Sequence, residues 1–385
     1  MTDKASEVPT SLFDRSARVR VLLEGRAPAR MLHGLVTGTI QGPVSVPGDP
    51  EDSSAGWSTA AHRSLVLTPK GRIVSDLRLI RLPGGDDAAF LLELPAAGSH
   101  PLFAHLGRYL PPRFARPTDI SADTRMLTLV GPGAADALAS ALAAETPTLA
   151  VQVQGLGDMA PGEARFSGVP TSPGSPFVAV VRTEGVGPAA WDLIGTPAPI
   201  AALQAHLLAA GVSTAGDAAW ETLRIERGTP ETGRELDESV IPPEAGLERS
   251  HIDDAKGCYT GQEVIVRVRD RGRVNRHLRG LLFGDGSGDG LGDGSAPEVG
   301  AAVWIEGRDR EAGEVRSATF SPRAGRWIAL AYVRREAEPG DTVRVGTPDG
   351  PAAEVRALGE HEWTQAAPPE APESGQPADQ ENPGS

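Results

Sequence analysis

The sequence predicts an α+β fold that ends in a small antiparallel β domain. Some stretches alternate apolar and polar residues, as strands do, whereas others repeat apolar residues at a helical spacing. Because the two kinds of segment are mixed rather than strictly alternating, the class is α+β. At 385 residues the chain is too long for one ordinary core, so two or three domains are expected.

Strands dominate the first hundred residues. RVRVLLEG places Val19, Val21 and Leu23 at alternate positions, and a Gly/Pro turn and a short helix around Met31 to Val36 follow. Residues 64–94 then form an antiparallel meander of three runs, SLVLT, RIVSDLRLIRL and AAFLLEL, joined by turns at 69–71 and 84–87.

Three helices are expected in the middle of the chain. The first begins after Gly131-Pro132, the second after Pro199 ends at Gly211, and the third has Asp217 as its N-cap and ends at Gly228. The apolar faces of the first two consist of Ala134, Leu138 and Leu142, and of Ile200, Leu203 and Leu207.

Beyond residue 281 the chain changes to a Gly/Asp run and then to short β-rich runs at 303–305, 314–320, 326–333 and 341–346. Evenly spaced strands of this kind predict a small barrel or sandwich. Asp285, Ser287, Asp289 and Gly290 imitate a calcium loop, but Ala296 stands where an EF-hand needs glutamate. The run is therefore interpreted as a flexible linker.

Composition narrows the class of function. The net charge of -14 argues against direct nucleic-acid binding, and any anionic ligand must meet a local basic patch. The single cysteine, Cys258, cannot form an internal disulfide. No signal peptide and no apolar run of membrane-spanning length is apparent. A soluble, cytoplasmic protein without a membrane partner is expected.

The familiar catalytic and metal-binding motifs do not occur. The sequence has no GxSxG elbow, Walker loop, HExxH or Cys/His metal spacing, and its eight histidines are scattered. Hydrolase and nucleotide-phosphate interpretations therefore lack a motif, and no metal ligands are predicted.

The densest motif is KGCYTGQE at 256–263. Gly257 and Gly261 bracket Cys258 and Tyr259 and permit a sharp turn or a close approach to a ligand, while Lys256 lies near enough in sequence to favour a thiolate. Cys258 is therefore a candidate reactive thiol. The alternative is that it is a small buried apolar residue, as lone cysteines usually are.

The next residues, VIVRVR, are expected to form a strand with its valines on one face. Six arginines fall in this region against one aspartate, which predicts a cationic stripe suited to phosphate or a polyglutamate tail. A solvated strand face with surface ion pairs is the alternative. The stripe consists of Arg267, Arg269, Arg271, Arg273, Arg276 and Arg279.

Together, KGCYTGQE and the RGRVNRHLRGL run resemble the signature of YgfZ folate-binding proteins, a branch of the aminomethyltransferase-like, or glycine-cleavage T-protein, superfamily. Four further segments resemble that family in its order, and the resemblance covers about residues 13–358. These segments are LHGLVTGTI, LTPKGRIVSDLRLIR, WETLRIERGTPETGRELDESVIPPEAGL and RWIALAYV.

The resemblance implies two α+β folate-binding lobes with antiparallel sheets and a C-terminal barrel. The expected boundaries are disordered tails at 1–12 and 361–385, a folate-binding region at 13–280, a Gly-rich linker at 281–297 and a barrel at 298–360. Tetrahydrofolate, or a one-carbon derivative, is expected in a central opening.

Matching segments imply that the acidic residue facing the pterin is Asp192 and that the folate-contacting arginine is Arg224. A carboxylate suits the pterin's N–H donors, and a guanidinium suits carboxylate or carbonyl oxygens. A strand-edge polar residue and a surface helix charge are the respective alternatives. The other expected cofactor-binding residues belong to the signature: Lys256, Gly257, Tyr259, Gly261, Gln262 and Glu263.

One departure separates this chain from aminomethyltransferases. Where they carry an Asp-Asp pair, it reads Ser75-Asp76, so the catalytic carboxylate is expected to be replaced by Ser75. The resemblance thus implies an accessory protein that supports iron-sulfur cluster assembly or repair, and indirectly tRNA modification, with Cys258 as functional thiol. Its implied partners are iron-sulfur proteins or assembly factors. The rivals are an aminomethyltransferase that uses Asp76 and an RNA-binding adaptor that uses the arginine stripe.

Overall fold

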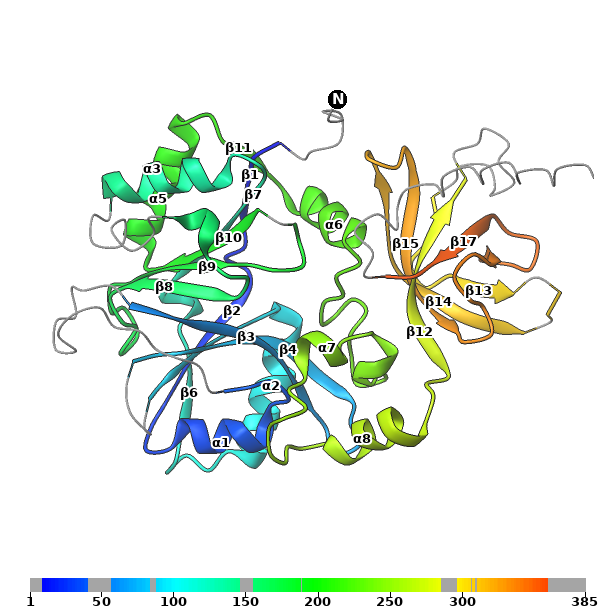
Figure 1. The fold of residues 1–385 in the computed structure, drawn as a ribbon, viewed down its shortest axis with the longest axis horizontal. Helices are drawn as coiled ribbons and strands as arrows, with labels where there is room; N and C mark the ends of the chain where they lie inside the picture. Colours follow the sequence, from blue (N-terminus) through cyan, green and yellow to red (C-terminus); the bar gives the residue numbers. More distant parts are fainter. Residues whose placement is uncertain are drawn as a thin grey trace, which may run out of the picture.

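A computed structural model describes residues 9–40, 57–83, 88–145, 155–187, 189–284, 296–305, 307–308 and 310–358. The expected turn at 84–87, most of the Gly/Asp run and the acidic tail lie outside these residues. The described chain forms an eleven-stranded sheet with helices and a closed six-stranded barrel, which stand side by side in Figure 1. The predicted α+β class with a C-terminal barrel is confirmed.

The sheet has the order β11-β1-β7-β10-β9-β8-β3-β4-β5-β2-β6, and every pairing except β1 with β11 is antiparallel. Its strands are β1 (Ser11–Asp14), β2 (Val19–Glu24), β3 (Trp57–Leu67), β4 (Ile73–Arg81), β5 (Phe90–Leu94), β6 (Arg116–Asp119), β7 (Arg125–Val130), β8 (Glu163–Ser167), β9 (Val178–Arg182), β10 (Ala190–Gly195) and β11 (Ser213–Ala215). The predicted meander is β3, β4 and β5.

The helices are α1 (Pro28–Leu35), α2 (Ala96–Tyr109), α3 (Ala134–Glu145), α5 (Pro197–Ala209), α6 (Asp217–Glu226), α7 (Glu248–His251) and α8 (Gln262–Arg271), with short 3-10 turns η1 (Ser121–Asp123), η2 (Leu156–Asp158) and η3 (Pro242–Glu244). The barrel consists of β12 (Arg276–Phe283), β13 (Ala302–Ile305), β14 (Glu311–Ser321), β15 (Arg326–Arg334), β16 (Thr342–Val345) and β17 (Ala352–Arg356). The three helices expected in the middle of the chain are α3, α5 and α6, with Asp217 as the first residue of α6 rather than its cap.

The long sheet doubles back so that its two halves face each other. Along β2, Val21 and Leu23 join the core beneath α1 and α2, while Leu22 between them joins a second core. Along β10, Leu193 packs with α3 and α5, while Ile194 joins that same second core. Because successive strand residues point to opposite faces, the layers run helices, half-sheet, half-sheet, helices.

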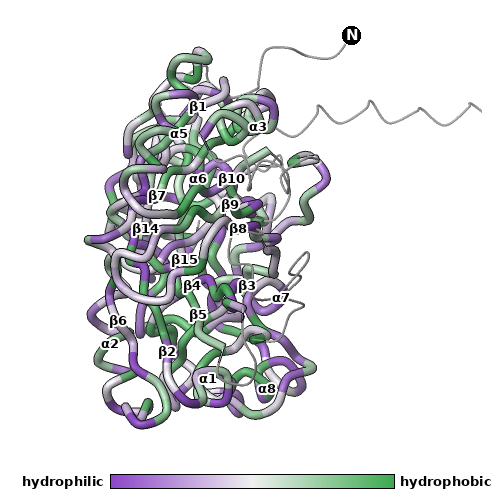
Figure 2. Tube along the Cα trace, turned by 90° about the vertical axis from the view of Figure 1, so that its left-hand side faces the viewer, coloured by the Kyte–Doolittle hydropathy of each residue, from purple (hydrophilic) through white to green (hydrophobic). Residues whose placement is uncertain are grey.

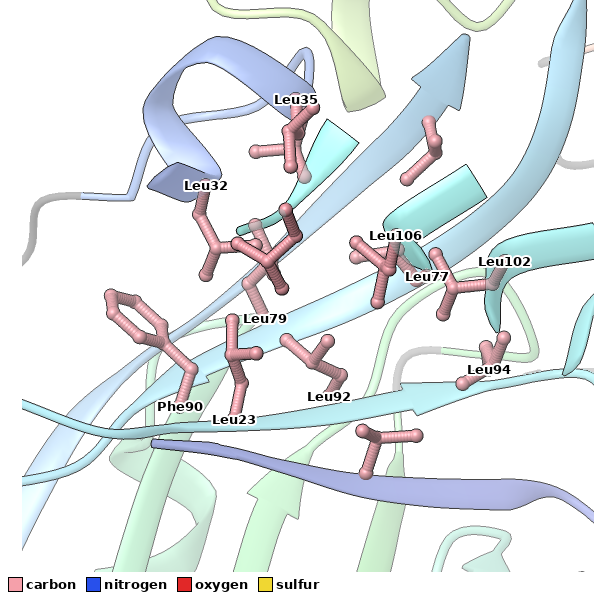
Figure 3. Packing of buried hydrophobic residues seen from close by; sticks show 14 of the residues in the cluster. Leu23, Leu32, Leu35, Leu77, Leu79, Phe90, Leu92, Leu94, Leu102 and Leu106 are labelled. Carbon is pink, nitrogen blue, oxygen red and sulfur yellow. The ribbon is translucent and has the colours of Figure 1, made fainter. Parts of the chain in front are cut away.

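The core beneath α1 and α2 shows how the sequence builds one outer layer (Figure 3). Leu32 and Leu35 of α1 and Leu102 and Leu106 of α2 are spaced for one helical face and lie over Leu79 of β4 and its neighbours. In Figure 2 many of the hydrophobic stretches run through the interior of the molecule, and hydrophilic colouring is frequent at its outer turns. In the described part of the chain, no helix is long and apolar enough to cross a membrane.

The N-terminal boundary of order differs from the prediction. Ser11 and Leu12, expected in a disordered tail, belong to β1, which pairs with β7 on one side and β11 on the other. Leu12 is only 2% exposed. The Pro-rich, polar flank hid a strand of four residues whose two apolar side chains fill the core.

The barrel also begins earlier than predicted. Its first strand, β12, precedes the Gly/Asp run and pairs with both β15 and β17. Residues 276–280 of this strand fall in the predicted folate-binding region and 281–283 in the predicted linker, because the Gly/Asp run resembles a domain boundary. The run instead lies between β12 and β13, which follow each other along the chain.

The VIVRVR segment is a helix, not the predicted strand. Gly261, at φ 85°, precedes α8, and Glu263 and Arg267 form an i,i+4 ion pair on its exposed side. Ile265 packs into the core with Leu278. Strand preference of β-branched residues depends on their packing context, and here tertiary contacts of a helical face override it.

Three hydrogen bonds attach α6 to barrel strand β14. Thr222 pairs with Thr319 at 2.7 Å, and Arg224 donates to Ser317 at 3.1 Å. Ser321 donates to Glu226 at 2.6 Å. Alternate residues of α6 therefore meet alternate residues of β14, and this register fixes α6 between the sheet and the barrel (Figure 1).

Candidate functional site

The space between the two half-sheets changes from apolar to charged toward one end. On β4, Ile80 faces the inner core, and Arg78 and Asp76 follow it at alternate positions. On β10, Ile194 is followed in the same way by Asp192. Both charged strands border one cavity of about 330 Å³, a size within the range of small-molecule sites.

Other elements complete the cavity wall. Glu93 of β5 and Thr128 of β7 come from the inner face, and Trp220 and Arg224 come from α6. Most of the remainder comes from the turn before β2, the loops at 183–186, 227–231 and 244–247, α7, and β12 of the barrel at 277–279. The cavity thus lies where both half-sheets, α6 and the barrel meet.

Alternating charges run along the cavity. Arg78 donates to Asp192 at 2.6 Å and lies 3.1 Å from Glu93. Arg18 bridges Glu93 to Glu231, with 2.6 Å between its Nη1 and Oε1 of Glu231. Burial of charge is costly unless each group is paired, and this ladder gives each of its charged groups at least one partner of opposite charge.

The ladder sets the charge state of Glu93. Burial by itself raises the pKa of this carboxyl, but Arg18 and Arg78 outweigh burial and lower the pKa to about 2. The same carboxylates raise the pKa of Arg18 against the opposing effect of burial. All three groups are therefore charged at neutral pH.

Asp192 is positioned as an acceptor. Its Oδ1 accepts from the hydroxyl of Thr128 at 2.6 Å, and its Oδ2 accepts from Arg78 at 2.6 Å. A carboxylate oxygen can accept two hydrogen bonds. Each oxygen of this 3% exposed residue can therefore accept one more, from a ligand.

Asp76 and Ser75 point to opposite faces of β4. Asp76 lines the cavity, and its Oδ1 accepts from the backbone and hydroxyl of Thr232. Burial raises the pKa of Asp76 although Arg18 opposes the rise. Ser75 is fully buried on the helix side, so close to α2 that a Cβ on Gly98 would collide with it. The serine at position 75, which replaces the first aspartate of the family pair, therefore leaves the carboxylate of Asp76 in the cavity.

Arg224 borders the cavity but is already occupied. Its Nε donates to Glu221 at 2.8 Å, its Nη1 to Glu235 at 3.0 Å and to the carbonyl of Thr229 at 3.2 Å. Its Nη2 donates to Glu221 and Ser317. An arginine has five N–H donors, and here all five have partners in the protein. These contacts give Arg224 a structural role.

The signature segment lies outside the cavity wall, on the α1 side of the molecule. Lys256 donates from Nζ to the carbonyls of Val36 at 2.6 Å and Gly38 at 3.0 Å, instead of reaching the thiol. Burial lowers the pKa of Lys256 to about 8. Cys258 is exposed, and Gly257 before it approaches the ring of His33.

The rest of the signature packs or begins a helix. Tyr259 is 8% exposed in the core that joins the sheet to the barrel, and burial raises the pKa of Tyr259 to about 12. Gly261 packs so closely on the carbonyl of Thr68 that a Cβ would lie 2.6 Å from that oxygen. Gln262 and Glu263 open α8. None of the signature residues lines the cavity.

The arginine stripe is divided among different surroundings. Arg267 and Arg269 are exposed on α8, where Arg267 pairs with Glu263 and Arg269 with Asp254. Arg276 pairs with Glu244 beside the cavity, and Arg279 lines it. A continuous cationic face for nucleic acid is therefore not formed by these residues.

Sequence reasoning missed most of the ladder. Arg18, Arg78, Glu93, Thr128 and Glu231 were not singled out. A usable signal was present in β4 and β5, where one or two charged residues interrupt runs that are otherwise buried and apolar. Such a charge needs a buried partner. Among the described residues, no group of three or more His, Cys, Asp or Glu side chains is arranged to hold a metal ion.

Comparison with known proteins agrees with this architecture. Residues 56–251 match the model of the GCVT N-terminal domain, and residues 287–359 match that of the glycine cleavage T-protein C-terminal barrel domain. The chain is 30% identical over 343 residues to an aminomethyltransferase of Rubrobacter xylanophilus, covering 89% of this chain and 81% of the relative. It is 31% identical to an aminomethyltransferase of Cutibacterium acnes, covering 74% and 71%.

A solved structure supports the fold alone. The crystal structure of the glycine cleavage system aminomethyltransferase T from Bartonella henselae superposes with a TM-score of 0.69, at 21% identity, covering 92% of this chain and 86% of that one. The two domain matches and the relative from Rubrobacter xylanophilus extend over most of the sequence. The chain therefore belongs to the glycine cleavage T-protein, or aminomethyltransferase, family.

Proposed function

We propose that the cavity binds a reduced folate, tetrahydrofolate or a one-carbon derivative of it. The observation that carries the proposal is Asp192. Thr128 and Arg78 fix its carboxylate at the cavity wall and leave both oxygens able to accept. The amino group and ring N–H of a pterin are adjacent donors, and a fixed carboxylate can accept from both.

The remaining wall residues fit such a ligand. Asp76 has one oxygen, Oδ2, without a hydrogen-bond partner among the described residues. Buried donors without a partner, Nε of Arg15 and Nε1 of Trp220, face the acceptors of a ligand. When bound, a reduced folate supplies nitrogens that carry a one-carbon group. Burial raises the pKa of Asp76, so its carboxyl takes up a proton more readily than that of an exposed aspartate.

For the role built on this site, we propose an accessory protein for iron-sulfur cluster assembly or repair, and through it tRNA modification. Support comes from the signature that resembles the YgfZ branch and from the exposure of Cys258 outside the cavity. A thiol at that position is accessible to another protein, whereas a thiol inside the cavity would be reserved for the small ligand. Iron-sulfur proteins or assembly factors are the corresponding partners.

A second role, aminomethyl transfer, is favoured by a different observation. Asp76 faces the cavity although Ser75 differs from the family pair. The relatives from Rubrobacter xylanophilus and Cutibacterium acnes are named aminomethyltransferases. In this role Asp76 acts on the bound folate, and Cys258 has no part.

Calorimetric titration with tetrahydrofolate tests the shared basis of both roles. Asp192→Asn keeps the size of the side chain but turns one acceptor into a donor that faces the ligand's N–H groups. We expect its Kd to rise at least about tenfold, or roughly 1.4 kcal/mol. Asp136→Asn, exposed on α3, is the matched control and should bind like wild type. Failure of the wild type to bind any reduced folate would refute the proposal.

Two further variants separate the roles. If the accessory role holds, Cys258→Ser abolishes complementation of cells lacking the protein, and its folate affinity stays at the wild-type value. If aminomethyl transfer holds, Asp76→Asn abolishes methylene transfer from a lipoyl carrier protein, and Cys258→Ser complements fully. Both variants need an unchanged urea midpoint so that the outcome reflects function rather than folding.

A further inference from the structure

The face of α6 toward the cavity carries donors that the protein does not use. Trp220, Arg224 and Arg227 are spaced i, i+4 and i+7, which places them on one face of the helix and its C-cap. Arg224 is saturated by protein acceptors. Trp220 and Arg227, on the same face of the helix, still have donors without a protein acceptor.

Trp220 and Arg15 contribute two buried donors. The guanidinium of Arg15 lies over the Trp220 ring at 4.0 Å. Nη2 of Arg15 reaches Glu231 at 3.3 Å, but its Nε has no hydrogen-bond partner, and neither does Nε1 of Trp220. An unpaired buried donor is destabilising, so two side by side indicate a missing acceptor.

Arg227 adds a charge to the same place. Its guanidinium makes no hydrogen bond or ion pair within the described residues. It extends across the backbone at Gly187, where a Cβ would lie 3.8 Å from its Nη2, and the adjacent Val186 packs in the cluster that Trp220 joins. Burial and the neighbouring Arg323 lower the pKa of Arg227, which means that a second cation lies nearby.

The carboxylates in reach are already engaged. Glu231 accepts from Arg15 and Arg18, and Glu226 accepts from Ser321. Glu93 is shared between Arg18 and Arg78, and Asp192 is paired with Arg78. The donors at this end of the cavity therefore lack a hydrogen-bond acceptor, and the nearby cations favour one with negative charge.

We infer that the α6 end of the cavity is a carboxylate subsite, formed by Arg15, Trp220 and Arg227. A carboxylate offers two oxygens, which match one neutral N–H and the donors of a guanidinium. The glutamyl end of a folate and a free organic acid share this chemistry. The first source rests on the proposed function, whereas the subsite itself rests on the unpaired donors.

Fragment titrations by calorimetry test the subsite. The tail probe is p-aminobenzoyl-L-glutamate, the head probe is 6-methyltetrahydropterin, and glutarate is the free diacid. Arg227→Gln removes the charge without breaking a side-chain hydrogen bond or ion pair among the described residues. Trp220→Phe removes the indole N–H and keeps a smaller aromatic ring beneath Arg15. Arg30→Gln, on the exposed side of α1, is the matched control.

We expect Arg227→Gln to raise the Kd of the tail probe about tenfold and Trp220→Phe to raise it about fivefold. The head probe should bind both variants like wild type. Equal tail affinity in wild type and Arg227→Gln overturns the subsite, and so does an equal loss of the head probe.

The two proposals fail separately. A wild type that binds the tail probe in an Arg227-dependent manner, but binds neither the head probe nor tetrahydrofolate, refutes the folate function and supports the subsite. Glutarate that binds as tightly as the tail probe supports a free acid as the source, whereas weaker glutarate supports the glutamyl end.

Discussion

The cavity and the signature segment show two opposite relations between sequence and site. The signature is eight consecutive residues, yet most of them stabilise local structure: Lys256 tethers two carbonyls, Tyr259 fills a core and Gly261 precedes a helix. The cavity ladder extends from Arg18 to Glu231 with no local motif. In this protein the consecutive motif at 256–263 therefore marks a locally packed segment, whereas single charged residues scattered along the sequence form the wall of the cavity.

The largest expected loss of stability is at the buried ion pair of Arg224 and Glu235 beside the cavity. Arg224→Met leaves Glu235, which is fully buried, without its charged partner. Removal of one member of a buried pair costs about 3–5 kcal/mol, and urea unfolding measures it. Arg267→Met, in an exposed pair with Glu263, should cost less than about 1 kcal/mol. Similar losses in both would remove the distinction between the two regions.

The second effect is the acid sensitivity of the ladder. The folded-state pKa of Glu93 is about 2, below its ordinary value of 4.5. Its contribution to stability is therefore complete above about pH 4.5 and disappears as the pH falls toward 2. The difference corresponds to roughly 3 kcal/mol.

We expect Glu93→Gln to unfold more easily at pH 6, with a smaller further loss between pH 4.5 and 2 than wild type. Urea midpoints over that range measure both slopes. Parallel slopes in the two proteins would mean that Glu93 is not held charged by the ladder.

The smallest effect belongs to the signature. Gly261→Ala meets two costs, a positive φ and a Cβ 2.6 Å from the carbonyl of Thr68, whereas Gly300→Ala has a similar φ but open space. Strain at positive φ costs about 1 kcal/mol or more. We expect Gly261→Ala to be the more destabilising by roughly 1 kcal/mol in thermal unfolding. Equal losses would show that the close packing does not constrain this glycine.

The sequence predicted those fold elements whose pattern is set by their own residues. The meander and the helices α3 and α5 alternate or repeat apolar residues over enough length to be read directly. β1 is too short for that, and β12 was hidden because the Gly/Asp run resembled a boundary. α8 was read as a strand because its β-branched residues have a local preference that packing of Ile265 overrides.

The site was predictable only where one residue carries its own signal. Asp192 and Arg224, which the family resemblance implies as folate contacts, both line the cavity, but the donors of Arg224 are occupied by Glu221, Glu235 and other protein acceptors. Their contact with folate stays a prediction. The ladder depends on pairing between strands: Arg78 and Glu93 lie opposite each other on β4 and β5, and Arg78 also reaches Asp192 of β10. Its members become recognisable only when Arg78 and Glu93 are seen to share one buried face.

The attachment of α6 to β14 couples the free energy of ligand binding in the cavity to the position of the barrel. Thr222, Arg224 and Glu226 hold the barrel strand, and Trp220 on the same helix lines the cavity. A ligand that restrains α6 must raise the free energy of barrel detachment, and detachment must weaken the ligand by the same factor. Amide exchange in β14 should therefore slow on ligand binding, so that a strand that does not line the cavity reports its occupancy.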